Sequence, residues 1–333
     1  MSDSVFCTES FLGDPKFYNE QWMHREMLFD RIRCEAFKKA IFSAVSPGDV
    51  VLDVGAGSGI LSMFAAQAGA AKVYAVERTV TAQLARQLIE KNDFQDRVII
   101  MQGDIDHVEL PEKADVLVME WMGGFGVDEN LLPPLIRARD KWLKPDGCMI
   151  PEKVTSFLAP VYDRKLEERL NFWKSKPYDI DLELIGWHLV NEVHIARNDV
   201  RTGDLLASPH AMWTVDACSL SLAQAEAAFE VEHCFDITNP GRLTALAAWF
   251  EAELGDGINL GNAPGAPNTH WGRTILPIDK FYDLCVGDKI DTGFSCVPVS
   301  HNLSDNRWWV RVGEDERRCY EGRQGCTASP GFH

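Results

Sequence analysis

Two glutamates, Glu120 and Glu129, flank a glycine-rich stretch, MEWMGGFGVDEN, that directly follows the apolar run ADVLV. A guanidinium ion stays charged in proteins and presents a planar fork of N–H donors that fits carboxylates bidentately. Two desolvated carboxylates repel each other, but each becomes a strong hydrogen-bond acceptor once a guanidinium enters. The pair therefore predicts a site that selects arginine over lysine, unless both side chains simply lie in solvent on the rim of a loop.

A second chemical motif is the turn VLDVGAGSG, which contains Gly55, Gly57 and Gly59. The third glycine comes one residue too early for the G-x-G-x-x-G fingerprint of dinucleotide sites. Asp53 precedes the glycines, where it is placed to face a cationic amino group, and would repel a pyrophosphate. Glu77 ends the next apolar run and is placed to accept hydrogen bonds from ribose hydroxyls. Together they predict a nucleoside with a zwitterionic tail, as in S-adenosylmethionine.

Short apolar strands alternate with helices up to about residue 151. The strands are VVLDV, AKVYAVE, RVIIMQGD, ADVLVMEW and CMIPEK, and the helices are ILSMFAAQAG, TAQLARQLIEKN and LLPPLIRARDKWLKPDG. Strands that are apolar on both faces and separated by helices predict a parallel, doubly wound α/β sheet. Ligands of such sheets bind beyond the carboxyl ends of the strands, where both motifs begin.

After Pro151 the pattern changes to strands without intervening helices, which predicts an all-β barrel or sandwich. The expected strands are VTSFLAPVYD, HAMWTVDACSLSL, AAFEVEHCFDI, LTALAAWFEAEL, RTILPID, DKIDTGFSCVPVS and RWWVRVGE. Residues 163–190 interrupt them with helical periodicity and a high density of aromatics. We expect an N-terminal helical segment over 1–48, an α/β domain over 49–151 and the β domain over 152–333.

Bulk composition agrees with a two-domain globular protein of 333 residues with 46% hydrophobic residues. The net charge of −17 disfavours direct nucleic-acid binding and favours cationic partners, although acidic surfaces also serve solubility alone. Nine scattered cysteines without C-x-x-C pairs indicate reduced thiols and no zinc site. No stretch reaches the ~18 apolar residues of a membrane span, and the start lacks the features of a signal peptide. We therefore expect a cytoplasmic or nuclear protein with no membrane partner.

Several segments resemble the successive motifs of the protein arginine methyltransferases: VLDVGAGSG, VYAVE, ADVLV, LKPDGCMIP, the double-glutamate loop EWMGGFGVDE and the Thr-His-Trp loop NTHWGRTIL. The similarity runs from about residue 22 to the C-terminal region. It implies transfer of a methyl group from S-adenosylmethionine to arginine. It also implies a Rossmann-like methyltransferase domain with an N-terminal lid, and a β-barrel domain whose helical dimerisation arm lies at about 163–190.

The resemblance assigns roles to individual residues. Glu120 and Glu129 would orient the arginine and place its charge, and either could pass on its proton. His270 would pair with Asp30 across the domains, and Arg33 would clamp the carboxylate of the cofactor. The remaining assignments are Met27, Trp271 and Tyr18 on the substrate side, with His24, Asp53, Gly55, Gly57, Gly59, Glu77 and Asp106 on the cofactor side. No metal is expected.

The lid segment both follows and departs from the family pattern. His24, Met27, Asp30 and Arg33 keep its His-x-x-Met-x-x-Asp-x-x-Arg spacing, which places them along one helical stripe. The family's Tyr-Phe-x-x-Tyr box is degenerate, because the match DPKFY keeps only Tyr18 and the match VFCTE keeps only a phenylalanine. This departure leaves open a catalytically weak paralogue that acts as the regulatory subunit of an active enzyme.

The expected product and partners follow from the same resemblance. Met27 argues against symmetric dimethylation, and Leu131 replaces a second methionine, which leaves mono- and asymmetric dimethylarginine open with the second favoured. Substrates would be cationic Gly-Arg-rich segments of RNA-binding proteins or histone tails. The arm predicts a homodimer or a heterodimer with a paralogue. A small-molecule methyltransferase or a nicotinamide dehydrogenase explains the paired glutamates and the Thr-His-Trp loop less well.

Overall fold

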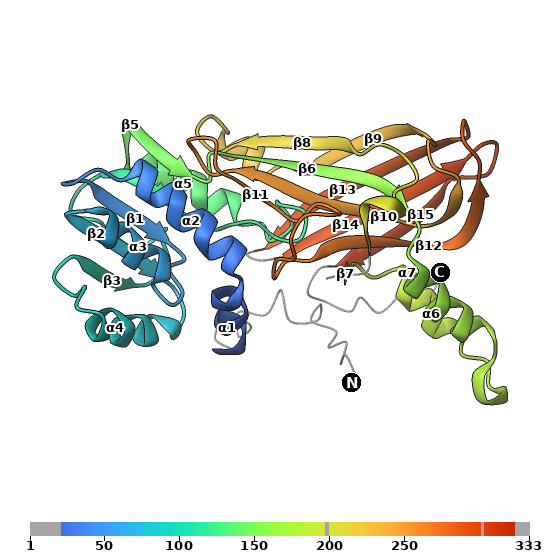
Figure 1. Ribbon diagram of the computed structural model, residues 1–333, viewed down its shortest axis with the longest axis horizontal. Coiled ribbons are helices and arrows are strands. Elements are labelled where there is room, and N and C mark those ends of the chain that lie inside the picture. The colour runs from blue at the N-terminus through green and yellow to red at the C-terminus, as the bar shows by residue number, and fades with distance from the viewer. Residues whose placement is uncertain (1–20, 197–199, 301–302, 324–333) are drawn as a thin grey trace.

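The chain forms an α/β domain and a β domain that lie end to end, with a helical arm projecting from the far end of the β domain (Figure 1). The computed structural model describes residues 21–196, 200–300 and 303–323. Tyr18 and the degenerate tyrosine box lie outside these residues. Both domains share one continuous cluster of buried apolar side chains.

The α/β domain is built on a five-stranded parallel sheet in the order β3-β2-β1-β4-β5. Its strands are β1 (Val50–Val54), β2 (Lys72–Glu77), β3 (Val98–Gln102), β4 (Ala114–Val118) and β5 (Leu143–Ile150). All five residues of β1 are buried, as expected for a central strand covered on both faces. The chain order reverses between β1 and β4, so the carboxyl ends of these two strands flank the point where a ligand is expected.

Helices cover this sheet: α2 (Arg31–Ala44), α3 (Ile60–Ala68), α4 (Thr81–Lys91) and α5 (Leu132–Trp142). The expected continuation of α5 through LKPDG is wrong. The helix ends at Trp142, and the following residues form β5, which pairs with β4 through a register shift between Ala114 and Val116. Sheet pairing thus overrides the local helical pattern.

The N-terminal helix is broken at Asp30 into α1 (Gln21–Phe29) and α2, whereas the sequence pattern predicts one continuous stripe. Asp30 has non-helical backbone angles and caps α2, because its carboxylate accepts the backbone N–H of Arg33 at 2.9 Å. An aspartate at this position favours a new helix start over continuation. None of the described helices combines the length and the apolar character of a bilayer span.

The β domain is a barrel-like pair of antiparallel sheets, in agreement with the expected all-β architecture. The larger sheet runs β7-β12-β10-β6-β8, with β11 paired to β10, and the smaller runs β15-β14-β13-β9. The strands are β6 (Lys153–Val161), β7 (His194–Ala196), β8 (His210–Asp216), β9 (Phe229–Asp236), β10 (Gly241–Glu253), β11 (Asn259–Gly261), β12 (Arg273–Leu284), β13 (Lys289–Ser300), β14 (Leu303–Val312) and β15 (Arg318–Arg323). The sequence pattern missed β7, β11 and β15; the first two contain only three residues each, too few to show alternation.

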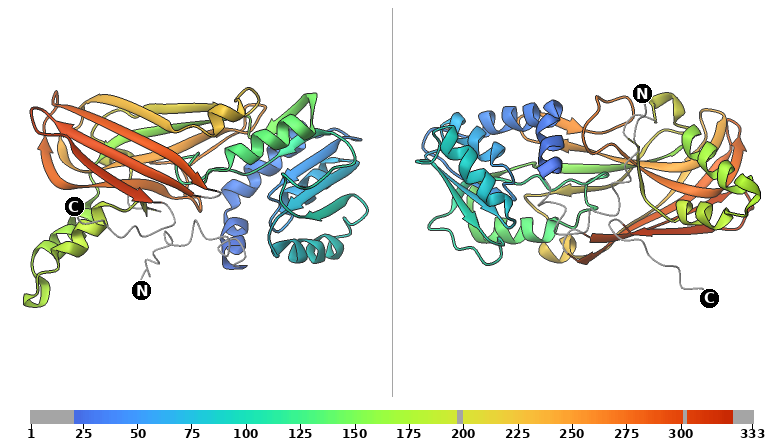
Figure 2. Two further views of the ribbon diagram at one scale, coloured as in Figure 1. Left: turned by 180° about the vertical axis from the view of Figure 1, so that it is seen from behind. Right: turned by 90° about the horizontal axis from the view of Figure 1, so that it is seen from below.

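The arm consists of α6 (Arg164–Lys174), a turn at η3 (Pro177–Asp179) and α7 (Glu183–Val190). Figure 1 and the left view of Figure 2 show it projecting away from the barrel. Two short elements remain: η4 (Thr202–Asp204), and α8 (Leu222–Ala225), which packs against α5. At the opposite end from the arm, the barrel contacts the α/β domain through the loops that form the candidate site.

Candidate active site

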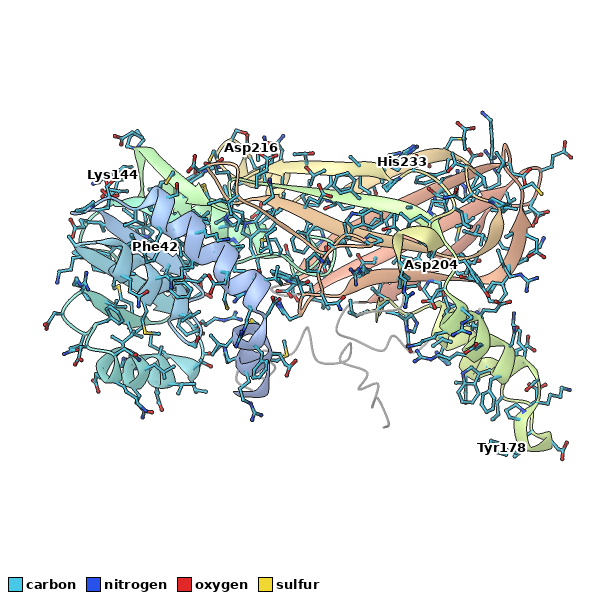
Figure 3. All side chains as sticks on the ribbon, viewed as in Figure 1. Phe42, Lys144, Tyr178, Asp204, Asp216 and His233 are labelled. Carbon is cyan, nitrogen blue, oxygen red and sulfur yellow. The ribbon has the colours of Figure 1, made fainter. Side chains whose placement is uncertain are left out.

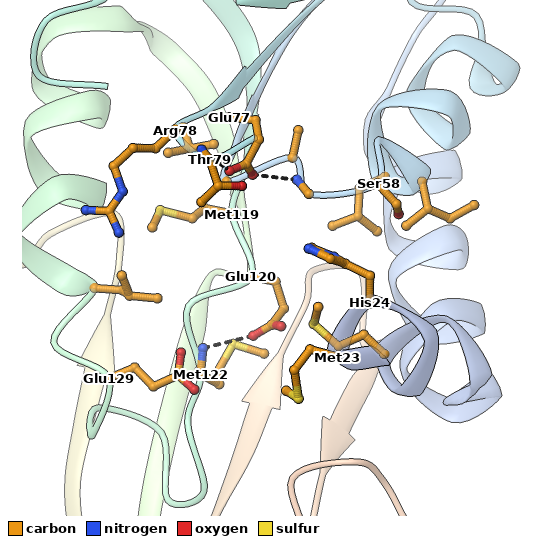
Figure 4. Close-up of a pocket in the computed structure, with 18 of the residues that line it drawn as sticks. Met23, His24, Ser58, Glu77, Arg78, Thr79, Met119, Glu120, Met122 and Glu129 are labelled. Atoms are coloured by element: carbon orange, nitrogen blue, oxygen red, sulfur yellow. Dashed lines mark hydrogen bonds between the residues drawn. The ribbon is translucent and has the colours of Figure 1, made fainter. Parts of the chain in front are cut away.

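A cavity opens where the carboxyl ends of β1, β2 and β4 face α1, α2 and the loop before β12. Both predicted centres line it: the glycine turn with Glu77, and the double-glutamate loop with His270 and Trp271. Figure 4 shows Glu77 and His24 around one part of the cavity, with Glu120 and Glu129 around another. Segments that are far apart in the sequence, from Met23 to Trp271, thus meet in a single site.

The glycine turn is shaped for close approach of a ligand. Gly55 and Gly57 adopt positive φ angles of 75° and 53°, which side chains rarely tolerate. A side chain on Gly57 would also place its Cβ 3.1 Å from the ring of His24. Gly59 lies behind the turn instead of in the cavity wall, where it begins α3 and packs against Ile89 of α4. Its role is therefore to let two helices approach, which corrects its assignment to the cofactor.

Glu77 is 6% exposed and is held rigidly at the end of β2. One of its carboxylate oxygens accepts the N–H of Gly57 at 2.8 Å, and the other accepts the N–H of Thr79 at 2.7 Å. A carboxylate oxygen has two lone pairs, so each oxygen keeps one for hydroxyl donors in the cavity. The arrangement suits recognition of a ribose.

His24 closes this part of the cavity from α1. It is buried, and its Nε2 lies 3.2 Å from the hydroxyl of Thr81 on α4. Met27, one turn further along α1, also lines the cavity. The lid helix is thereby fixed against the nucleoside side of the site.

Besides Gly59, two further predicted cofactor residues are not in the cavity wall. Asp53 is 1% exposed and accepts a hydrogen bond from Ser62 at 2.5 Å, so it does not face a cationic ligand as expected. Asp106 forms a bidentate ion pair with Arg137 at 2.7 and 2.8 Å on the surface. Asp104, which the sequence argument overlooked, lines the cavity in its place. The sequence motifs identified the segments that form the cavity, but the direction of each side chain is set by the folded structure.

Asp53 predicts a measurable pH effect on stability. Burial raises the pKa of its carboxyl to about 6, despite the bond from Ser62. The pKa of an aspartate in the unfolded chain is ~3.9. Ionisation of the buried carboxyl therefore lowers the stability of the fold progressively between roughly pH 4 and pH 6, and the full loss is present above pH 6. We expect Asp53→Asn to raise the free energy of unfolding by roughly 1–3 kcal/mol at pH 8, and by less at pH 5, in urea titrations.

The same substitution at the exposed Asp96 serves as the control and should change little at either pH. If Asp53→Asn changes the free energy of unfolding by the same amount at pH 5 and pH 8, ionisation of the buried carboxyl does not destabilise the fold. Cofactor affinity measured in parallel reports whether this buried group also acts on the ligand through the strand.

Glu120 occupies the position expected for an arginine-binding carboxylate. Its side chain is 13% exposed and lies 3.2 Å from Nη2 of Arg33, while its other oxygen accepts the N–H of Met122 at 3.0 Å. Glu129 is half-buried and lines the same cavity. Figure 4 shows both carboxylates directed into the same space. The alternative of two solvated glutamates on a loop rim is therefore wrong.

The loop between these glutamates is held by residues that the sequence argument missed. Asp128 is 1% exposed, and its carboxylate accepts the N–H groups of Gly124 at 2.8 Å and Phe125 at 3.1 Å. Asn130 adopts a φ of 50° and donates from its side chain to the carbonyl of Ser300 at 2.7 Å. Aspartate and asparagine favour such turns, so their positions beside Glu129 were an available signal.

Arg33 lines the cavity beside Glu120. It is 6% exposed and bonds to Glu120, and its Nε has no hydrogen-bond partner among the described residues. A buried N–H without a partner is costly, which makes this guanidinium a fitting receptor for a ligand carboxylate. The predicted clamp is thus compatible with the geometry, and the contact with Glu120 is an addition that the sequence did not indicate.

The predicted contact between His270 and Asp30 is present. One oxygen of Asp30 accepts both the backbone N–H of His270 at 2.8 Å and its Nδ1–H at 2.9 Å. Burial raises the pKa of Asp30, but the hydrogen bonds from His270 and Arg33 outweigh it and keep that pKa below its usual value. Burial lowers the pKa of His270 more than the bond to Asp30 raises it. The pair is therefore a neutral imidazole on a carboxylate at neutral pH.

Trp271 joins the Thr-His-Trp loop to the double-glutamate loop. Its indole Nε1 donates to the carbonyl of Met122 at 2.6 Å, and its ring meets that of Phe250 edge-on at 5.1 Å. At 6% exposure it forms a wall of the cavity, as expected for the substrate side. Tyr18, the remaining substrate-side assignment, lies outside the described residues.

Comparison with family models gives matches to both domains. A model of the arginine methyltransferase oligomerization subdomain matches residues 152–311, and one of the ribosomal protein L11 methyltransferase (PrmA) matches residues 37–149. Protein arginine N-methyltransferase 6 of Danio rerio is 33% identical over 297 residues, which cover 86% of this chain and 84% of that protein. Protein arginine N-methyltransferase PRMT10 of Oryza sativa subsp. japonica is 33% identical over 351 residues, which cover 93% and 88%.

Solved structures give the same picture. The Trypanosoma brucei PRMT1 enzyme-prozyme heterotetrameric complex with AdoHcy contains a chain with a TM-score of 0.84 and 28% identity, covering 92% of this chain and 99% of that one. Protein arginine methyltransferase 10 of Arabidopsis thaliana has a TM-score of 0.76 and 27% identity, covering 92% and 98%.

Proposed function

The chain belongs to the protein arginine methyltransferase family and uses S-adenosylmethionine as its cofactor, and on that premise we propose that it methylates arginine in Gly-Arg-rich proteins or histone tails. The resemblance found in the sequence and the α/β-plus-barrel architecture are confirmed. The proposal rests on one observation above all: Glu120 and Glu129 line the same cavity as the glycine turn.

The residues present fit the cofactor. Gly55 and Gly57 leave space for close backbone approach, Glu77 suits ribose hydroxyls, and Arg33 offers an N–H to a carboxylate. When bound, the cofactor supplies an electrophilic methyl group on a sulfonium. The chain's own task is then to hold an arginine nitrogen in line with that methyl group, which is catalysis mainly by positioning.

The two carboxylates are suited to this task. Glu120 and Glu129 hold the positive charge on one side of the guanidinium fork, which leaves the opposite nitrogen richer in electrons. Arg33 keeps Glu120 in place through the ion pair at 3.2 Å. The proton released by the product passes to one of the glutamates, while His270, neutral and bonded to Asp30, fixes the lid against the barrel.

We propose monomethyl- and asymmetric dimethylarginine as the products. Met27 and Leu131 both line the cavity, so both side chains limit the space around the accepting nitrogen. The net charge of −17 would attract cationic substrates over a distance and make kcat/KM fall as salt is added. Substrate segments of low net charge should show little salt dependence.

The direct test incubates the purified chain with labelled S-adenosylmethionine and a Gly-Arg-rich peptide, followed by amino-acid analysis of the product. Incorporation into mono- and asymmetric dimethylarginine is expected, with a peptide in which lysine replaces every arginine as the control. Labelling of the lysine peptide, or binding of cofactor without transfer to any peptide, would contradict the proposal.

A regulatory role is the second candidate, favoured by the departure in the tyrosine box and by the similarity to an enzyme-prozyme complex. In this case the chain alone binds cofactor without turnover, and a paralogue from the same organism restores activity. Glu120→Gln in this chain then separates the roles. It abolishes the restored activity only if this chain carries out the transfer.

Self-association through the arm is proposed for either role. Exposed apolar side chains gather there: Phe172, Tyr178, Ile180, Leu184, Ile185 and Trp187. Figure 3 places Tyr178, which is 80% exposed, at the tip furthest from the barrel. Such a concentration of apolar groups is typical of an interface, and the matched family model describes an oligomerization subdomain.

Ile180→Asp is expected to weaken the oligomer at least tenfold, because a charge would be buried at the contact. Sedimentation velocity over a concentration series measures the shift. Val286→Asp is the matched control, since Val286 is an equally accessible apolar residue, 65% exposed, between β12 and β13. Equal effects of both substitutions would exclude the arm as the interface.

A further inference from the structure

Asn262 is a fully buried residue that makes side-chain contact with the loops on both sides of the site. It follows β11 and precedes the Thr-His-Trp loop, and it is 1% exposed. Its Nδ2 lies 2.7 Å from the carbonyl oxygen of Gly124 in the double-glutamate loop. The same nitrogen lies 2.5 Å from the carbonyl oxygen of Gly272, directly after Trp271.

The amide group is also anchored to the barrel. Its Oδ1 accepts the backbone N–H of Phe250 at 2.9 Å, and the backbone N–H of Asn262 donates to the carbonyl of Phe250 at 3.2 Å. A primary amide has two N–H donors, so each hydrogen serves one loop while the oxygen is held by β10. No other standard side chain of this size offers two donors and one acceptor in a single plane.

We propose that Asn262 is a positioning residue that fixes the double-glutamate loop relative to the Thr-His-Trp loop, and thereby aligns the arginine carboxylates with the lid held by His270. Both contacts are made to backbone at glycine, where no side chain intervenes. Arg273 stabilises the same loop, since its guanidinium donates to the carbonyls of Ala263 and Ala266 at 3.0 and 3.1 Å. Asn262 itself touches neither ligand; its effect passes through Gly124 and Gly272.

The test replaces Asn262 by leucine, which has a similar volume but no donors. We expect hydrogen exchange to become at least tenfold faster in both segments, 121–130 and 268–273. We also expect kcat to fall at least tenfold while cofactor Kd stays within threefold, because the glycine turn and Glu77 lie on other strands. The kinetic part depends on the proposed methyl transfer, whereas the exchange measurement does not, so failure of one is distinguishable from failure of the other.

Asn306→Leu is the matched control. Asn306 lies on β14 at 0% exposure, and its amide has no hydrogen-bond partner within the part of the chain that the structure describes. The control should leave both loops protected and kcat unchanged. If Asn262→Leu does not fold, Asn262→Asp replaces it, because its carboxyl donates one hydrogen when protonated and none when ionised. Its kcat should then fall as pH rises, relative to the unsubstituted protein.

For Asn262→Leu, the proposal is overturned by faster exchange in only one of the two loops, or by a kcat within threefold of the unsubstituted protein with both loops still protected. For Asn262→Asp, a pH profile parallel to that of the unsubstituted protein has the same meaning. The proposal is also overturned if Asn306→Leu speeds hydrogen exchange in the two loops as much as Asn262→Leu does, because the effect would then reflect general loosening of the barrel.

Discussion

Replacement of Glu120 by glutamine is expected to lower kcat/KM for an arginine peptide at least ~30-fold, equivalent to about 2 kcal/mol of transition-state stabilisation. Glutamine keeps an oxygen for the N–H of Met122, so the loop has no reason to rearrange. It removes the negative charge that faces Arg33 and the substrate. It also places an NH₂ group, a donor, against the N–H donors of those two guanidinium groups. The loss should therefore appear mainly in kcat, with a small change in cofactor affinity.

Steady-state kinetics with a Gly-Arg-rich peptide measure this effect. Glu109→Gln is the control. It makes the same replacement of a carboxylate by an amide, but in an exposed ion pair with Lys141. Exposed pairs contribute about 0–1 kcal/mol, so the control should remain as active as the unsubstituted protein. Unchanged kcat/KM for Glu120→Gln would remove this carboxylate from the mechanism.

A methyl group on Gly124 should be more damaging than its size suggests. Its Cβ would lie 2.4 Å from the hydroxyl oxygen of Thr274 and 3.3 Å from Cδ1 of Ile195. Thr274 is fully buried in β12, so the loop must move instead. We expect Gly124→Ala to lower kcat/KM roughly 100-fold and to destabilise the fold by about 1–3 kcal/mol.

The double variant Gly124→Ala/Thr274→Ala tests the cause, because it removes the oxygen that the new Cβ would strike. It should recover a large part of the lost kcat/KM, whereas Thr274→Ala alone should cost little. Gly203→Ala is the control for added bulk, since a Cβ at Gly203 meets nothing within 4 Å. No recovery in the double variant would mean that the loop fails for a reason other than this contact.

The local elements of the α/β domain could be predicted because they depend on neighbouring residues. Apolar runs at β1 and β4 and the glycines after β1 are visible as short patterns. Where tertiary contacts compete with local preference, the prediction failed. The first five residues of β5, LKPDG, continue a helical pattern but belong to the strand that pairs with β4. Asp30 interrupts a periodic helix because its carboxylate caps α2 and receives His270.

The amino-acid sequence by itself determined the chemistry. The paired carboxylates of Glu120 and Glu129 suit an arginine, and the glycine turn with Glu77 suits a nucleoside. Tertiary structure decided which carboxylates serve that purpose. Asp53 and Asp106 have the right type and position in the sequence, yet the fold turns them towards Ser62 and Arg137. Residue type is a local property, but the direction of a side chain depends on partners that only folding brings within hydrogen-bonding distance, as Asn262 and Gly124 show across 138 residues.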